Sequence, residues 1–156
     1  MRVIMLWELI LVLFLTAFFL HFVWEMWQIP LYVGMSEAGH WSAVVQCTRA
    51  TVGDGFIALM AYGIAAIATR NKLWLFQRSV SNMSLYLISG LTITVIIEYF
   101  ATTVYGRWQY SELMPMMPVV NIGISPLLQW IFIPPISIWV SAIILQGRRC
   151  DGPDSS

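Results

Sequence analysis

Charged residues, histidine and cysteine are all scarce in this sequence. Asp, Glu, Lys and Arg make up only 10% of its 156 residues, whereas 59% are hydrophobic and the mean hydropathy is +0.76. Soluble globular domains carry about 25% charged residues, so the composition excludes an ordinary soluble domain and indicates an integral membrane protein. The net charge is zero and the sequence has no basic run, which argues against nucleic acid as a partner.

Long apolar stretches are what the sequence has in abundance. A helix needs about 20 apolar residues to cross the roughly 30 Å hydrocarbon core of a bilayer. Four stretches meet that requirement: 3–27, 51–69, 83–105 and 119–145. The predicted fold is all-α, an integral membrane four-helix bundle in which 1–150 form one transmembrane domain and 151–156 a disordered tail. Six tryptophans near the predicted span ends indicate an interfacial aromatic belt: Trp7, Trp24, Trp27, Trp41, Trp74 and Trp108.

The basic residues indicate how the bundle lies in the membrane. Only Arg49 and Arg107 fall in the connections 28–50 and 106–118. The other six Lys and Arg residues fall at the N-terminus, in the 70–82 connection and in the C-terminal tail. Because cytoplasmic segments are enriched in Lys and Arg, both termini are predicted inside (N-in/C-in). We expect a multi-pass protein of a bacterial inner membrane.

Polar side chains within the spans gather toward the predicted outer side. His21 and Glu25 end the first span, Asp54 begins the second and Glu98 lies late in the third. At a rise of 1.5 Å per residue, Glu98 lies about 8 Å and Asp54 about 5 Å below the outer surface. Ionisable groups at such depth are costly unless they are partnered, so they indicate a functional site.

Helical spacing places more polar side chains beside these acids. Residues three to four apart share a helix face, and polar residues recur at this spacing in three places: His21–Glu25–Gln28, Glu98–Thr102–Tyr105 and Ser125–Gln129. Glu98 has only apolar and aromatic neighbours in the sequence, so it must reach Arg49, Arg107 or His21 across the bundle or be protonated. The structural alternative is an interfacial anchor at the end of the first span and a simple hydrogen bond at Glu98.

No motif for a metal or cofactor is present. Cys47 and Cys150 are predicted on opposite sides of the membrane and form no metal motif. The sequence contains no haem attachment motif, phosphate loop, dinucleotide fingerprint or Ser-His-Asp arrangement. One imidazole and three carboxylates could in principle surround an ion, but common sites need more nitrogen or sulfur ligands. We therefore predict no metal and no cofactor.

The stretch 98–130 contains an intramembrane Glu, then a Gly-aromatic-x-Tyr turn, then Gly-x-x-Pro and a Trp one turn on: Glu98, Gly106, Trp108, Tyr110, Gly123, Pro126 and Trp130. It resembles small membrane families of carotenoid biosynthesis, the carotenoid hydratases and membrane-type lycopene cyclases. Those enzymes usually have more spans, and the doubled acidic signature of the cyclases is missing here. The resemblance implies acid-base chemistry on a polyisoprenoid or similar lipid, with Glu98 as the transferable residue.

These observations favour a small membrane enzyme that transfers protons at a double bond of a lipid-soluble, isoprenoid-like substrate near the outer leaflet. The expected catalytic residues are Glu98 as proton donor, Glu25 with His21 as base or relay, and Asp54 as a stabiliser of positive charge. The expected substrate-binding residues are Arg49, Arg107, Trp24, Gln28, Thr102, Trp108, Tyr110, Ser125, Gln129 and Trp130.

Two other functions remain open at this point. The first is a proton-coupled transporter, because small multidrug exporters are four-helix proteins with a single essential membrane Glu, a role open to Glu25 or Glu98. Such a protein would form a homodimer. The second is a non-catalytic assembly subunit whose acids pair with basic residues of another protein.

Overall fold

The computed structural model describes residues 5–118 and 121–150. Within them the chain forms four helices that are long and apolar enough to cross a membrane: α1 (Leu6–Trp27), α2 (His40–Ala68), α3 (Val80–Tyr99) and α4 (Ile124–Cys150). The prediction of an all-α bundle is therefore confirmed. Two predicted span starts, at 3–4 and 119–120, and the predicted tail, 151–156, lie outside the described residues.

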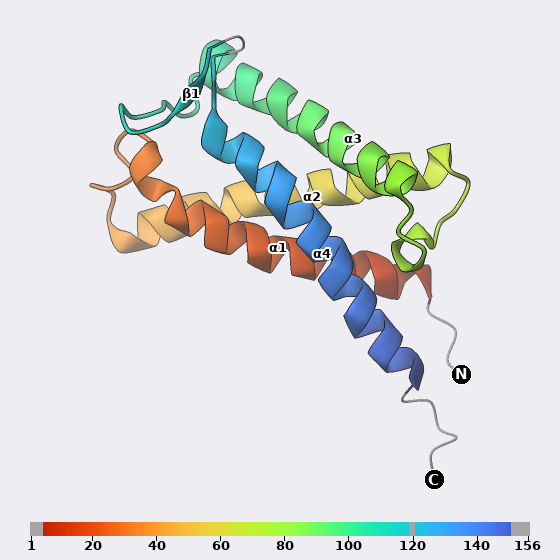
Figure 1. The fold of residues 1–156 in the computed structure, drawn as a ribbon. Helices are drawn as coiled ribbons and strands as arrows, with labels where there is room; N and C mark the ends of the chain where they lie inside the picture. Colours follow the sequence, from red (N-terminus) through yellow and green to blue (C-terminus); the bar gives the residue numbers. More distant parts are fainter. Residues whose placement is uncertain (1–4, 119–120, 151–156) are drawn as a thin grey trace.

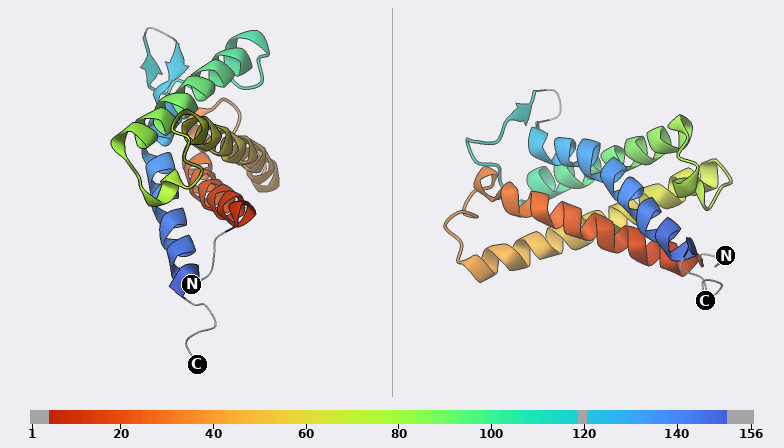
Figure 2. Two further views of the ribbon diagram at one scale, coloured as in Figure 1. Left: turned by 90° about the vertical axis from the view of Figure 1, so that its right-hand side faces the viewer. Right: turned by 60° about the horizontal axis from the view of Figure 1, so that its bottom comes forward.

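The helices pack as a ring. α1 packs against α2 and α4, and α3 packs against the same two helices, with α4 crossing α1 and α3 obliquely (Figures 1 and 2). α1 begins and α4 ends near the 69–79 connection, and the 28–39 and 105–123 connections lie at the opposite end (Figure 1). We call these the inner end and the outer end, after the predicted orientation.

α2 is longer than the sequence indicates. It begins at His40, with Gly39 at its N-cap position, so 40–50 is helical rather than part of an outer connection. Polar residues in 40–50 suggest a loop, but neither Gly nor Pro interrupts the helix there. A helix of 29 residues is about 43 Å long and exceeds the roughly 30 Å hydrocarbon core. α2 is therefore longer than one crossing of the hydrocarbon core requires.

The outer end of α3 changes its helical form directly after Glu98. The α-helix ends at Tyr99 and continues as a π-helix over Phe100–Val104. Gly106 then adopts a positive φ of 55°, which glycine tolerates best. Insertions of this kind are frequent at functional sites.

The two outer connections are fastened to each other. The first contains a 3₁₀ turn, η1 (Ile29–Leu31), and Tyr32 pairs with Tyr110 of the second in an antiparallel bridge. Backbone hydrogen bonds of 2.9 Å join Val33 N to Gln109 O and Ser111 N to Leu31 O. The second connection also forms a short antiparallel hairpin, β1 (Met116–Met117) with β2 (Ile122–Gly123), in which Met116 faces Gly123.

The inner end is filled by an apolar core. The 69–79 connection carries a 3₁₀ turn, η2 (Trp74–Phe76), which inserts Trp74 between Tyr62 and Tyr86 at ring-centroid distances of 4.8 and 5.6 Å. Trp74 is fully buried. Its assignment to the interfacial belt is therefore wrong: the connection folds back over the end of the bundle, where the indole covers the core.

Small residues allow close packing between helices at two places. Ala58, Ala61 and Ala65 of α2 are fully buried, which is typical of close helix contacts. On α3, a Cβ at Gly90 would lie 2.2 Å from Cζ3 of the buried Trp130 ring. Gly90 is thus the notch in which Trp130 sits, and we call it the Gly90 notch.

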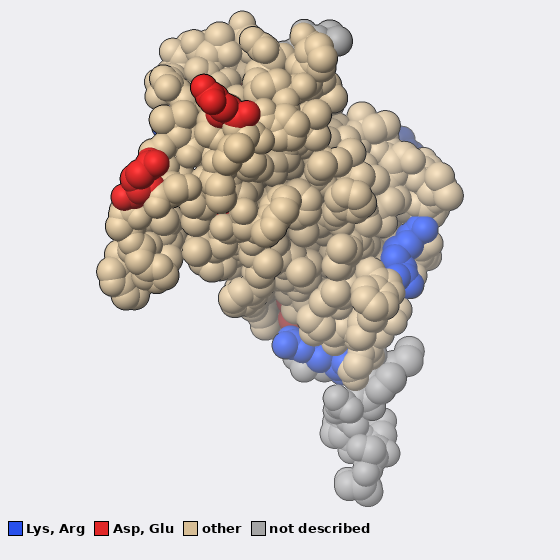
Figure 3. Space-filling model, turned by 60° about the vertical axis from the view of Figure 1, so that its left-hand side comes forward, with Lys and Arg blue, Asp and Glu red and all other residues tan. Residues whose placement is uncertain are grey.

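Charged side chains are distributed unevenly between the two ends. On the face drawn in Figure 3, most of the visible Asp and Glu surface lies toward the outer end and most of the Lys and Arg surface toward the inner end. The bundle surface between them is largely uncharged, as expected where a helix bundle contacts lipid.

Candidate functional site

Gln129 of α4 connects ionisable side chains of α1 and α2. Its Nε2 lies 2.8 Å from His21 Nδ1, 3.3 Å from Glu25 Oε1 and 3.3 Å from Asp54 Oδ2. His21 Nδ1 is also 3.6 Å from Asp54 Oδ2. An amide has only two N–H groups for these three acceptors, so at most two of them accept from Gln129 at one time. We call these four residues the acid centre.

A chain of hydrogen bonds continues from the acid centre toward the outer surface. Gln28 Nε2 donates to Glu25 Oε1 at 2.7 Å, and Gln28 Oε1 accepts from Ser125 Oγ at 2.7 Å. Ser125 Oγ in turn accepts from Trp24 Nε1 at 3.2 Å. Gln28 and Ser125 are buried. The predicted polar faces of α1 and α4 therefore meet each other directly.

Glu98 of α3 has its own pair of donors. Its Oε2 accepts from Tyr110 OH at 2.5 Å and from Trp108 Nε1 at 3.2 Å. Glu98 is buried, with 8% of its surface exposed. Donors directed at one carboxylate oxygen stabilise the negative charge that remains when the acid gives up its proton. Thr102 does not reach this carboxyl group, because its hydroxyl donates to the Glu98 backbone carbonyl at 2.7 Å.

Tyr110 and Tyr32 both have raised pKa values at the outer end. Burial raises the pKa of Tyr110 well above that of a free tyrosine, and the negative charge of Glu98 adds to the increase. Burial likewise raises the pKa of Tyr32, whose ring lies 5.6 Å from that of Tyr110. The phenol of Tyr110 therefore keeps the proton that it donates to Glu98.

The acid centre and Glu98 lie at the same end of the bundle but have separate hydrogen-bond partners. Trp130 lies beside the acid centre, with its ring centroid 5.4 Å from that of His21. Its Nε1 lies close to Asp54 without the geometry of a hydrogen bond.

The expected arginine partners do not reach Glu98. Arg49 and Arg107 are exposed, and the hydrogen bonds described for Glu98 come from uncharged side chains instead. Of the two alternatives for Glu98, a cationic partner from Arg49, Arg107 or His21 is therefore wrong, and the protonated acid stays a prediction. The cause is local. Arg49 lies on an exposed face of α2, which already begins at His40. Arg107 follows Gly106, whose positive φ turns the chain.

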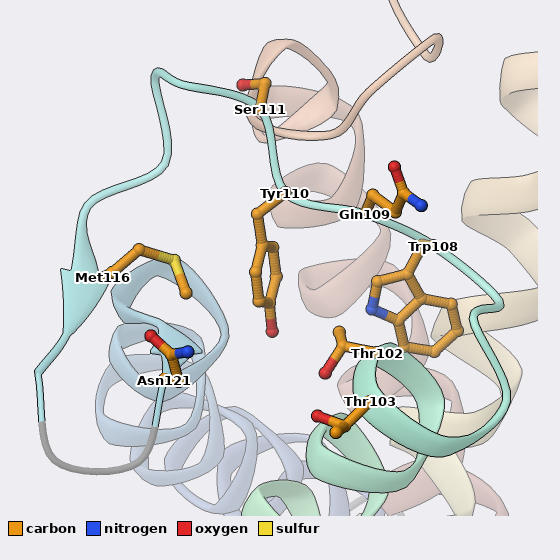
Figure 4. Close-up of a pocket in the computed structure, with 8 residues that line it drawn as sticks. All are labelled: Thr102, Thr103, Trp108, Gln109, Tyr110, Ser111, Met116 and Asn121. Carbon is orange, nitrogen blue, oxygen red and sulfur yellow. The ribbon is translucent and has the colours of Figure 1, made fainter.

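An open pocket lies on the outer side of Trp108 and Tyr110. It has a volume of about 380 Å³ and is lined by the π-helix, the 105–111 segment and the hairpin (Figure 4). The lining side chains are uncharged: Thr102, Thr103, Trp108, Gln109, Tyr110, Ser111, Met116 and Asn121. Tyr110 thus separates this pocket from Glu98, to which its hydroxyl donates.

Metal-ligand geometry is not found in the described part of the chain. Among these residues no group of three or more His, Cys, Asp or Glu side chains is arranged to hold an ion. His21, Glu25 and Asp54 are instead gathered around the Gln129 amide.

Several buried polar residues escaped the sequence analysis. Tyr86 and Thr94 of α3 and Ser137 and Ser141 of α4 are buried within the bundle. Their signal was present as spacing, because Tyr86 and Thr94 continue the four-residue repeat that ends at Glu98. Hydroxyl groups are common in membrane helices, so attention to ionisable residues alone misses such a repeat.

Comparison with protein-family models, curated proteins and solved structures finds no match to this chain. Its function is therefore inferred from the geometry of the site.

Proposed function

We propose that this protein is a small membrane enzyme that transfers protons at a carbon–carbon double bond of a lipid-soluble substrate. The observation that carries the proposal is Glu98, a buried acid whose Oε2 accepts from two uncharged donors, Tyr110 and Trp108. An acid in this setting can donate a proton and remain as a stabilised carboxylate.

The proposed reaction begins when Glu98 gives its proton to one carbon of the double bond. The π electrons form the new C–H bond, the adjacent carbon becomes a cation, and Glu98 is left as a carboxylate. Addition of water, loss of another proton or attack by a second double bond then gives hydration, isomerisation or cyclisation. Glu25 with His21 takes up the proton released in this second step, while Asp54 and the faces of Trp24, Trp108 and Trp130 stabilise the cation.

The proposed setting is a bacterial inner membrane with both termini inside. The apolar surface of the bundle and the basic character of its inner end support this orientation. The acid centre and Glu98 then lie in the outer half of the bilayer, where an isoprenoid-like lipid is accessible. The resemblance of 98–130 to carotenoid hydratases and membrane-type lycopene cyclases supports the same substrate class and a proposed role in lipid metabolism.

Deuterium transfer tests the proposal without knowledge of the substrate. Purified protein is reconstituted with a total lipid extract in D₂O, and the lipids are examined by mass spectrometry for deuterium at carbon. We expect a lipid whose deuterium content rises with wild-type protein and falls at least tenfold with Glu98→Gln. Glu112→Gln, which changes an exposed acid of the outer connection, is the matched control and should behave as wild type.

A lipid that gains one deuterium identifies isomerisation or cyclisation, and one that gains the mass of D₂O identifies hydration. Protein-independent labelling, or equal labelling by wild type and Glu98→Gln, would overturn the assignment of Glu98 as the proton donor.

A further inference from the structure

The buried face of α3 is polar along its whole length. Every fourth residue of the helix is buried, and none of these residues is aliphatic: Asn82, Tyr86, Gly90, Thr94 and Glu98. Its exposed face is apolar instead, with Ile88, Ile96 and Ile97 exposed. A membrane helix with its polar groups turned inward lines either a tight interhelical contact or a path for polar species.

α4 also carries buried polar groups, but away from this row. Ser137 and Ser141 are completely buried on its inner half, which diverges from α3 and contacts η2 (Figure 1). Pro134 and Pro135 lie within the same helix and lack backbone N–H groups, so the carbonyls of Trp130 and Ile131 lose their helical donors. We call the row on α3, from Asn82 to Glu98, the polar seam.

The polar seam contains two hydroxyl groups that nothing in the described structure satisfies. Tyr86 OH and Thr94 Oγ1 are buried without hydrogen-bond partners, on either side of Gly90. Buried polar groups are normally paired, so these two hydroxyls are suited to hold water.

The spacing of the seam suits proton transfer through water molecules. Thr94 and Glu98 are four residues apart, about 6 Å along the helix, which two hydrogen bonds of about 2.8 Å through one water nearly span. Tyr86 and Thr94 are eight residues apart, about 12 Å, so this interval needs about three waters. A hydroxyl donates and accepts at once, so it can receive a proton from one side while it releases its own to the other.

Trp130 interrupts the line between the inner and outer halves. Its ring occupies the Gly90 notch, one step from Tyr86 and one step from Thr94 on α3. The indole N–H donates but cannot accept, so the ring separates the inner hydroxyls from the acid centre.

We propose that the polar seam conducts protons between the inner end of the bundle and Glu98, with Trp130 in the Gly90 notch as its constriction. A proton enters from water near Asn82, passes through the Tyr86 hydroxyl and water oxygens, and reaches Glu98 by way of Thr94. Each oxygen binds one proton and releases another, so charge moves without net chemical change. This proton path rests on the proposed function in one respect only: it ends at Glu98, the proposed proton donor.

Proton flux in liposomes tests the seam. Purified protein is reconstituted in vesicles that contain a pH-sensitive dye, and a potassium gradient with valinomycin drives protons inward. Trp130→Ala should raise the flux at least tenfold above protein-free vesicles. Adding Tyr86→Phe or Thr94→Val should return it to within twofold of the wild-type value.

Ser89→Ala is the matched control on the same helix, because the Ser89 hydroxyl already donates to Leu85 O at 2.6 Å. In the Trp130→Ala background it should leave the flux unchanged. Near-ultraviolet circular dichroism of each variant checks that it is folded.

Two results would overturn the proposal: no flux above protein-free vesicles with Trp130→Ala, or a flux that Tyr86→Phe and Thr94→Val leave unchanged, which indicates a nonspecific leak. Deuterium transfer to lipid is measured separately with the wild-type protein. If no proton flux is seen but deuterium is still transferred to lipid, the proton path is refuted and the proposed function stands. If protons are conducted but no deuterium is transferred, the proposed function is refuted and the proton path stands.

Discussion

The inner and outer ends of the bundle differ in what fills the space between the helices. At the inner end, Trp74 stacks between Tyr62 and Tyr86 within an apolar cluster. At the outer end, the same space holds the acid centre and Glu98. Apolar packing tolerates lipid surroundings without special partners, whereas polar groups require a partner for every donor and acceptor. The comparison teaches that apolar packing fills the inner end, whereas His21, Glu25, Asp54 and Glu98 occupy the outer end.

The largest expected effect comes from removing the inner aromatic stack. Trp74→Ala deletes a fully buried indole and should lower the free energy of unfolding by about 3–5 kcal/mol. Thermal unfolding in detergent, followed by near-ultraviolet circular dichroism, measures the change. Trp41→Ala, at a position with 77% exposure, is the control and should change stability by less than about 0.5 kcal/mol. Equal effects at the two positions would show that Trp74 does not hold the inner end together.

A substitution at the Gly90 notch affects the boundary between the two ends. Gly90→Ala places a methyl group where the Trp130 ring now lies, and overpacking of this kind costs about 1–3 kcal/mol. Gly63→Ala is the matched helical control, because no atom lies within 4 Å of a Cβ there. The same unfolding measurement applies. If Gly90→Ala were as stable as Gly63→Ala, Trp130 would not depend on the notch.

Replacing the amide of the acid centre tests whether the polar network stabilises the outer end. Gln129→Leu keeps the approximate size of the side chain but leaves His21, Glu25 and Asp54 without their shared donor. Unsatisfied buried groups cost about 1–3 kcal/mol, and protection of the outer backbone amides from hydrogen exchange should fall first. Gln46→Leu, on an exposed surface of α2, should have no such effect. Loss of protection at the inner end first would contradict the division between the ends.

The smallest effect is expected from the outer tyrosines at alkaline pH. The pKa of Tyr110 is raised in the folded protein by burial and by Glu98, whereas an unfolded tyrosine titrates near pH 10. The folded state therefore keeps a proton that the unfolded state loses, so the contribution is complete below about pH 10 and declines above it. The slope is less than about 1.4 kcal/mol per pH unit, because Tyr110 is half-buried and solvent screens it.

Tyr110→Phe carries no such proton and should show a shallower decline in stability between pH 9 and pH 11. Tyr105→Phe, at an exposed tyrosine of the same connection, is the control. Parallel pH profiles for wild type and Tyr110→Phe would contradict the raised pKa.

Much of the bundle was predictable because membrane helices are specified locally. Each apolar stretch contains enough residues to satisfy its own backbone hydrogen bonds across the bilayer. The start of α2 was missed because the polar residues of 40–50 resemble a loop. No helix breaker lies among these residues, and the helix therefore begins at His40. Trp74 was misplaced because its sequence position near a span end does not tell whether the connection turns outward or folds back over the core.

The sequence by itself determined the four apolar helices and the gathering of His21, Glu25, Asp54 and Glu98 toward one end of the bundle, because length, hydropathy and helical rise are local properties. Only the tertiary structure decided the partners of those groups. Gln129 meets His21 from 108 residues away, and Glu98 accepts from Tyr110 and Trp108 rather than from an arginine. Hydrogen bonds depend on distances and directions between separate helices, and these are established only when the helices pack.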